Sequence, residues 1–135
     1  WGTLAATLLY WPLSCLLINP AITAIFLLAA FALGCWVCDK TARDLGVHDF
    51  GEIVWDEFLG VWLVLAYLPP ALWTRWGTLL CYLAAFLLFR LFDIAKPPPI
   101  RQIDRHTPGG LGIMLDDVLA AGYALAALWL TAAVL

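Results

Sequence analysis

The sequence of 135 residues has very little charge: Asp, Glu, Lys and Arg make up 13% of it, and none occurs before Asp39. Ordinary soluble domains carry about 25% charged residues. Apolar residues make up 64% of the chain, which is more than a soluble protein of this length can bury. The composition therefore excludes a soluble domain and predicts a membrane protein.

Basic residues are scarce as well, with seven Lys and Arg against ten Asp and Glu. The sequence has no basic stripe with interleaved aromatic residues, which argues against nucleic-acid binding. The four cysteines all lie in apolar stretches, so we interpret them as small hydrophobic residues rather than a disulfide framework. Nothing in the sequence indicates a protein partner; the membrane is the partner that it predicts.

Proline and charge divide the apolar sequence into five stretches, at residues 4–18, 21–38, 53–68, 72 or 76–92, and 113–135. A membrane-spanning helix needs about 20 residues, so the first stretch is short. None of the stretches has the strict alternation of a transmembrane barrel strand. We therefore predict an all-α, polytopic transmembrane helical bundle with about five spans, forming a single integral-membrane domain over residues 1–135.

Lysine and arginine gather in or beside two connections, between the second and third spans and between the fourth and fifth; only Arg75 lies elsewhere. The two connections are two crossings apart and therefore lie on the same side of the membrane. The positive-inside rule makes that side cytoplasmic. We expect the N-terminus inside and the C-terminus outside.

Two acid pairs interrupt apolar sequence: Asp56-Glu57 and Asp116-Asp117 each precede a span without further charge. An acid at the bilayer centre costs about 2.5–3.5 kcal/mol, and acids that converge also repel one another. Something positive must offset this cost, either basic side chains or a bound cation. The other acids are easier to place, and we interpret Asp44 and Asp104 as parts of a solvated loop surface.

The spacing of further acids favours convergence. Asp49, Glu52 and Asp56 follow an i, i+3, i+7 pattern, which places them on one face of a helix. Asp93 ends the fourth span at the same membrane level. Oxygen ligands with few histidines suit a hard cation such as Mg²⁺, which commonly binds substrate phosphate as well. We therefore predict a divalent-metal site, with a set of interfacial ion pairs as the alternative.

The basic residues near Asp93 fit the same site. Lys96, Arg101 and Arg105 flank it in a stretch that contains Pro97, Pro98 and Pro99. Arginine can bind phosphate oxygens with two parallel N–H bonds. These residues are therefore candidates for binding phosphate; the alternative for each is that it sets topology or contacts anionic lipid.

Several motifs of phosphate chemistry are missing. The sequence lacks Asp-x-Asp-x-Thr of the aspartyl-phosphate enzymes, Ser-Gly-His of membrane phosphatases with a histidine nucleophile, and the cysteine-to-arginine spacing of cysteine phosphatases. Only short fragments of the CDP-alcohol phosphotransferase motif are present, so we reject that match. What remains is attack on phosphorus by metal-activated water, with carboxylates as ligands and base.

Three ordered motifs resemble the signatures of the phosphatidylglycerophosphatase A family. They are Gly46–Asp49 with Ile53–Gly60, then Phe89–Pro97, then Gly109-Gly110 with Asp116-Asp117 and the following Ala121-Gly122. Members of that family usually begin with a segment that contains Ser-Pro and Pro-Gly-Thr. Only Trp1-Gly2-Thr3 is present here, so we expect that the N-terminal family segment is missing.

This resemblance implies a Mg²⁺-dependent lipid phosphatase of the bacterial inner membrane, with its active site facing the cytoplasm. The enzyme would convert phosphatidylglycerophosphate to phosphatidylglycerol and phosphate, a step that also leads to cardiolipin. The metal ligands that it implies are Asp49, Asp56, Glu57, Asp93, Asp116 and Asp117. The implied phosphate contacts are Arg90, Lys96 and Arg101. The catalytic acids, one of them the base, would come from Asp56, Glu57, Asp116 and Asp117; the sequence leaves the choice open.

Two other functions stay open. One is a phosphatase or transferase that acts on another lipid phosphate, which the same acids would serve. The other is a non-catalytic membrane cation carrier. A carrier needs polar groups deep within several spans, and these spans contain only scattered Ser, Thr and Tyr. The lipid phosphatase is therefore the function that the sequence favours.

Overall fold

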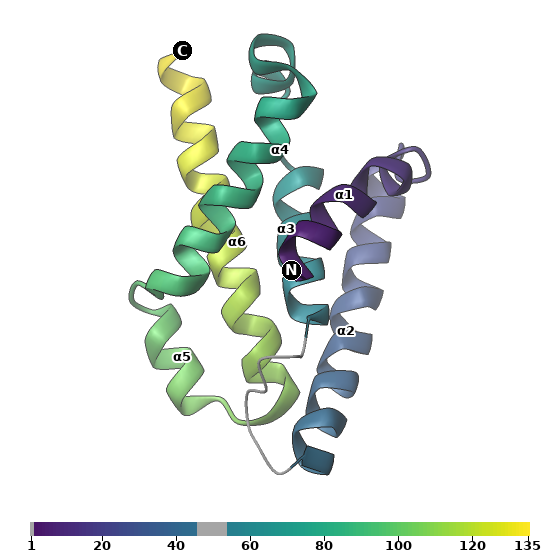
Figure 1. Cartoon of the computed structure of the whole chain (residues 1–135), viewed down its shortest axis with the longest axis vertical. Helices are drawn as coiled ribbons and strands as arrows, with labels where there is room; N and C mark the ends of the chain where they lie inside the picture. Colours follow the sequence, from purple (N-terminus) through teal and green to yellow (C-terminus); the bar gives the residue numbers. More distant parts are fainter. Residues whose placement is uncertain (1, 46–53) are drawn as a thin grey trace.

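The computed structural model describes residues 2–45 and 54–135, without the side chains of Ala42 and Leu45. These residues form six helices and no strand (Figure 1). The helices are α1 (Gly2–Ser14), α2 (Pro20–Leu45), α3 (Trp55–Ala66), α4 (Pro70–Ala95), α5 (Ile100–His106) and α6 (Gly109–Val134). The predicted all-α class is confirmed for this part of the chain.

In the part of the chain that the structure describes, three helices are long and apolar enough to cross a membrane: Pro20–Thr41 within α2, and all of α4 and α6. They correspond to the second, fourth and fifth predicted spans. By contrast, α1 has 13 residues and α3 has 12, whereas a helix that crosses alone needs about 20. The predicted count of five spans is therefore not confirmed.

Helix α6 packs against α2, α3, α4 and α5, while α3 lies among α1, α2, α4 and α6 (Figure 1). The short α3 is consequently buried over most of its surface, with Val61 and Val64 fully enclosed. The outer faces of the long helices carry exposed leucines such as Leu28, Leu79 and Leu130. So much exposed apolar surface would favour aggregation in water and fits contact with lipid instead.

Two glycines allow the helices to approach closely. A Cβ atom at Gly60 of α3 would collide with the Phe89 ring of α4, and one at Gly110 of α6 would collide with the Cys35 carbonyl of α2. Small residues at such contacts are typical of membrane bundles, in which van der Waals packing holds helices together. These two contacts set α2, α3, α4 and α6 side by side near the acid-rich end.

That end is more helical than the sequence indicated. Helix α2 continues past the predicted end at Cys38 and takes in Asp39. Helix α5 forms inside the second connection, where its prolines and glycines suggested no helix; the amide of Ile100 donates to the Pro97 carbonyl at 2.8 Å, and the Ile100 side chain is buried. Helix α6 begins at Gly109 instead of about residue 113, so the acid pair 116–117 lies two turns inside it.

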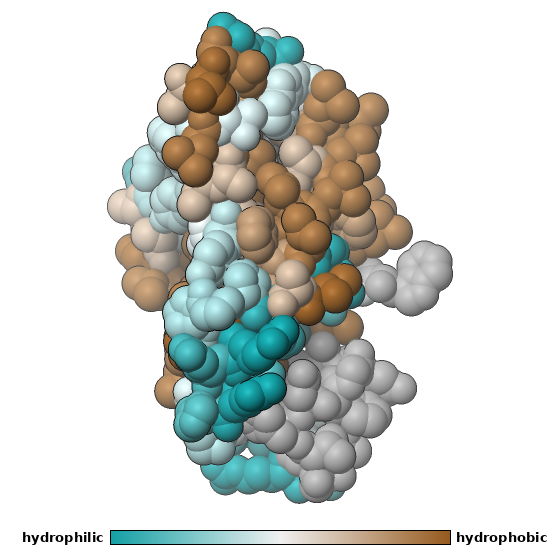
Figure 2. Space-filling model, turned by 90° about the vertical axis from the view of Figure 1, so that its left-hand side faces the viewer, coloured by the Kyte–Doolittle hydropathy of each residue, from teal (hydrophilic) through white to brown (hydrophobic). Residues whose placement is uncertain are grey.

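Charge separates along the bundle. Figure 2 shows strongly hydrophilic residues gathered in the lower part of one face, with a smaller group at the upper end and hydrophobic and intermediate residues between them. Figure 1 places α5 and the first turns of α6 at this lower end. The acids of the candidate site also lie toward this end.

Candidate functional site

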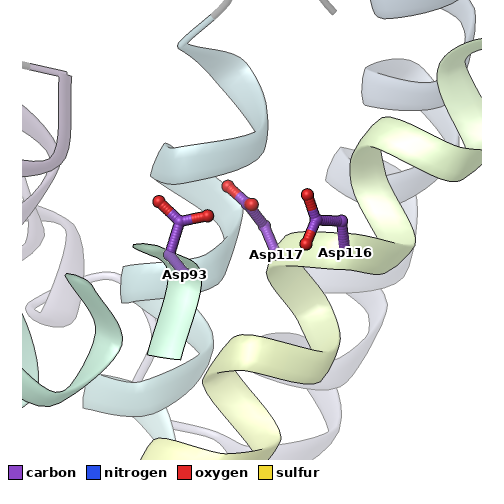
Figure 3. A group of neighbouring side chains, drawn as sticks. All are labelled: Asp93, Asp116 and Asp117. Carbon is purple, nitrogen blue, oxygen red and sulfur yellow. The ribbon is translucent and has the colours of Figure 1, made fainter. Parts of the chain in front are cut away.

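Three aspartates from two helices meet beside α3. Asp93 lies near the end of α4, and Asp116 and Asp117 lie in α6; one carboxylate oxygen from each is within 4.8 Å of the others. Figure 3 shows Asp117 between the other two. The structure thus brings together three of the six residues that the sequence proposed as metal ligands.

Two of these carboxylates are incompletely satisfied. The side chains of Asp116 and Asp117 are buried, and the Oδ1 atom of Asp116 and the Oδ2 atom of Asp117 find no hydrogen-bond partner among the described residues. A buried polar atom without a partner is costly, and a buried charge more so. A hard divalent cation bound by carboxylate oxygens would remove this cost.

Asp56 adds negative charge to the same place. It is buried in the first turn of α3, and its Oδ1 atom accepts the Glu57 amide at 2.9 Å. Asp56 and Asp93 both act electrostatically on Asp117. Asp56 is not one of the three residues whose carboxylate oxygens lie within 4.8 Å of one another. Its charge acts on Asp117, so it is a neighbour of this group and not a member of it.

Lys96 brings positive charge to the cluster. It ends α4 in a left-handed conformation (φ 45°), and its ammonium group hydrogen-bonds Asp116 and lies 3.8 Å from Asp104 Oδ2. Burial lowers the pKa of Lys96, but the hydrogen bond and charge of Asp116, with the charges of Asp104 and Asp93, raise it more. The net pKa lies above its ordinary value, and Lys96 is positively charged at neutral pH.

Arg90 is the second cation beside the cluster. Its Nη1 atom lies 2.7 Å from Asp93 Oδ2 and 3.2 Å from Glu57 Oε1. The other carboxylate oxygen of Glu57 accepts the hydroxyl of Thr3 at 2.8 Å. Arg90 thus links the acid at the start of α3 to the acid at the end of α4.

A family model described as phosphatidylglycerophosphatase A matches residues 1–132 of the chain. A Haemophilus influenzae protein of the same name is 54% identical over 125 residues, which cover 93% of this chain and 72% of that protein. The chain belongs to the phosphatidylglycerophosphatase A family. The family resemblance found in the sequence motifs is confirmed.

Two further relatives of this family member are informative. The phosphatidylglycerophosphatase A of Escherichia coli is 44% identical over 97 residues, covering 72% of this chain and 53% of that protein, so the match spans about half of it. A Bacteroides thetaiotaomicron protein, provisionally named phosphatidylinositol-3-phosphatase, is 38% identical over 126 residues, covering 90% and 75%. No solved structure matches the chain.

Two of the predicted site residues are not found with the three aspartates in the structure. Arg101 is exposed on α5, and no hydrogen bond or ion pair connects it to another described residue. Asp49, and with it Glu52, lies outside the described residues. The prediction that Asp49 binds metal therefore stays a prediction.

Two contacts of the site were missed from the sequence. Asp104 was interpreted as a solvated loop acid, but it faces Lys96, because α5 turns it back toward the end of α4. Thr3 contacts Glu57 across 54 positions of sequence. A lone threonine in an apolar helix gives no local signal of such a contact.

Proposed function

We propose that this chain hydrolyses phosphatidylglycerophosphate to phosphatidylglycerol and phosphate. Membership of the phosphatidylglycerophosphatase A family and the names of the Haemophilus influenzae and Escherichia coli relatives support this substrate. The single observation that carries the chemistry is a pair of buried carboxylate oxygens on Asp116 and Asp117, next to Asp93, that have no hydrogen-bond partner among the described residues. This group of carboxylate oxygens suits a bound cation and fits a phosphatase better than a simple membrane helix.

Mg²⁺ is the cofactor that we propose for Asp93, Asp116 and Asp117. The donor set consists of carboxylate oxygens, which Mg²⁺ prefers, with few other ligands, so that water and substrate phosphate can complete the coordination. When bound, the ion polarises phosphate oxygens and activates water for attack on phosphorus.

The remaining side chains would bind and orient the substrate. Arg90, paired with Asp93, and Lys96, paired with Asp116, place positive charge beside the three-aspartate group and suit the phosphate oxygens. Asp56, next to Asp117, is our choice for the base that accepts a proton from the attacking water. The bond between phosphorus and the glycerol oxygen then breaks, and that oxygen takes a proton from solvent. Glu57 is held by Thr3 and Arg90, which fits an orienting role.

We further propose that the acid-rich end faces the cytoplasm of a bacterial inner membrane, as the positive-inside rule predicts. Five crossings fit the contacts of the short helices. Helix α3 carries Asp56 beside Asp117 in its first turn and is followed by Tyr67, whose carbonyl accepts the Trp129 indole N–H at 3.1 Å. It therefore runs along α6 from the acid cluster toward the C-terminal end, enclosed by other helices that shield its backbone from lipid.

The test is phosphate release from phosphatidylglycerophosphate by the purified chain in detergent. We expect release with Mg²⁺, a loss of more than about 100-fold after chelation, and recovery when Mg²⁺ is returned, because removing the ion removes the main charge at the reaction centre. No release with Mg²⁺ would contradict the function. Release that a chelator does not change would contradict only the cofactor.

A substrate panel tests the head group. Phosphatidic acid and phosphatidylinositol 3-phosphate are the competing lipids, the second suggested by the name of the Bacteroides thetaiotaomicron relative. We expect the highest kcat/KM with phosphatidylglycerophosphate. A higher value for either competitor would assign the chain to another lipid phosphate.

A further inference from the structure

Thr3 connects the first helix to the acid site. Thr3 is 2% exposed, and its hydroxyl donates to Glu57 Oε2 at 2.8 Å. The other oxygen of Glu57, Oε1, accepts from Arg90 Nη1 at 3.2 Å. The carboxylate of Glu57 is therefore held from two sides, by α1 and by α4.

Arg90 is held in turn by two acids through a single nitrogen. Its Nη1 atom donates to Glu57 and, at 2.7 Å, to Asp93. A guanidinium group has five N–H donors, and its other two nitrogens make no hydrogen bond to a described residue. With the side chain 34% exposed, these nitrogens remain available to an incoming phosphate beside the three-aspartate group.

We propose that Thr3 is a positioning residue of the phosphatase reaction. Its hydroxyl fixes the Glu57 carboxylate, Glu57 fixes Arg90, and Arg90 is thereby oriented toward the substrate phosphate. This inference rests on the function proposed above and extends it, because it makes α1 part of the site as well as a packing partner of α3 and α4. Thr3 itself does not touch the substrate and acts only through Glu57 and Arg90.

The chain contains a matched control for this role. Thr7 lies one turn along α1, is 5% exposed, and donates its hydroxyl to the Thr3 carbonyl at 2.7 Å. It has the same chemistry and nearly the same burial as Thr3, but its hydrogen bond stays within α1. A purely structural hydroxyl in this helix should behave as Thr7 does.

The experiment compares Thr3→Val, Thr3→Ser and Thr7→Val in the full chain, with phosphatidylglycerophosphate and saturating Mg²⁺. We expect Thr3→Val to lower kcat about 10-fold with a smaller change in KM, because a hydrogen bond to a charged group is lost and the misplaced Arg90 serves mainly the transition state. Thr3→Ser keeps the hydroxyl and should retain most activity. Thr7→Val should stay within about twofold of the unmodified chain.

A double-mutant cycle separates positioning from packing. In an Arg90→Lys background, Thr3→Val should change kcat less than about twofold, because the group that it positions has already been replaced. An equal loss in both backgrounds would overturn the proposal, as would unchanged kcat in Thr3→Val. If Thr3→Val does not fold, Thr3→Ala takes its place in the same cycle. Absence of phosphate release by the unmodified chain would overturn the proposed function, and this inference with it.

Discussion

Two acidic regions lie toward the same end of the bundle and differ in how their charge is compensated. In the first, Asp39 of α2 has a partner for each oxygen: Arg43 pairs with Oδ2, and the Gly110 amide donates to Oδ1 at 3.3 Å. In the second, Asp93, Asp116 and Asp117 share Arg90 and Lys96, and two buried oxygens have no described partner. Both carboxylate oxygens of Asp39 therefore have partners, whereas the negative charge of the three-aspartate group is only partly compensated by the described residues.

The difference shows which acids serve the fold. Asp39 satisfies an amide in the first turn of α6, a place where a helix has free N–H groups and favours negative charge. It stabilises the contact of α2 with α6. The three-aspartate group instead crowds negative charge into a buried place, which costs free energy unless positive charge offsets it. The site is therefore distinguished by buried carboxylates whose charge is not fully paired, more than by the number of acids in it.

The strongest test of this comparison is Asp117→Asn. We expect turnover to fall more than about 100-fold, because a metal ligand is lost and even outer-shell partners are worth 10–100-fold. Without Mg²⁺ the variant should melt no lower than the unmodified chain, since one repelling charge is gone, and added Mg²⁺ should raise its melting temperature less. Phosphate release and thermal melting in detergent measure both effects.

Asp44→Asn is the control for that variant, because Asp44 is exposed on α2 and the same charge is removed. It should leave both turnover and stabilisation by Mg²⁺ unchanged. Near-normal turnover in Asp117→Asn would show that the buried acids of α6 are not the metal ligands.

Removing Lys96 should change two constants in opposite directions. In Lys96→Met we expect KM to rise about 10-fold, because a cation near the phosphate is lost, and the Mg²⁺ concentration for half-maximal activity to fall, because the cluster gains net negative charge. Titrations of substrate and of Mg²⁺ measure the two. Lys40→Met removes the same charge from an exposed lysine that lies over the Trp36 ring and should change neither.

The raised pKa of Lys96 implies that the effect of Lys96→Met does not change with pH near neutrality. Its folded pKa lies above the unfolded value, so any stability that it contributes is present below that value and is lost only as pH rises through the higher folded pKa, in the alkaline range. Between about pH 6 and 9 the charge of Lys96 is therefore constant. A pH dependence in that window that disappears in Lys96→Met would contradict the assignment.

Much of the site could be predicted from sequence because its acids stand in apolar surroundings. The pair Asp116-Asp117 is conspicuous for this reason, and the structure buries it. Arg101 was also proposed, on its proximity to Asp93 in sequence, but helix α5 leaves it exposed. No hydrogen bond or ion pair joins it to another described residue, so its role as a phosphate contact stays a prediction.

Other features depend on which helices pack together, and sequence periodicity does not contain that information. The contact of Thr3 with Glu57 joins α1 to α3, and no local pattern indicates it. Helix α5 lies in the connection between the fourth and fifth predicted spans, where no helix was predicted. Proline is well tolerated before and at the first turn of a helix, and α5 begins at Ile100, directly after Pro97–Pro99.

Among the acids of the two regions, Asp39 is expected to have the smallest effect on turnover, because both of its carboxylate oxygens already have partners. Asp39→Ala should lower the free energy of unfolding by about 0.5–2 kcal/mol, the usual value of a helix cap, and leave kcat within about twofold. Asp39→Asn keeps an acceptor for the Gly110 amide and should lose less stability. Thermal melting and phosphate release in the same detergent separate the two quantities. Suppose that Asp39→Ala folds but loses as much turnover as Asp117→Asn. The presence of partners around a carboxylate would then fail to distinguish acids that stabilise the fold from acids that serve the reaction.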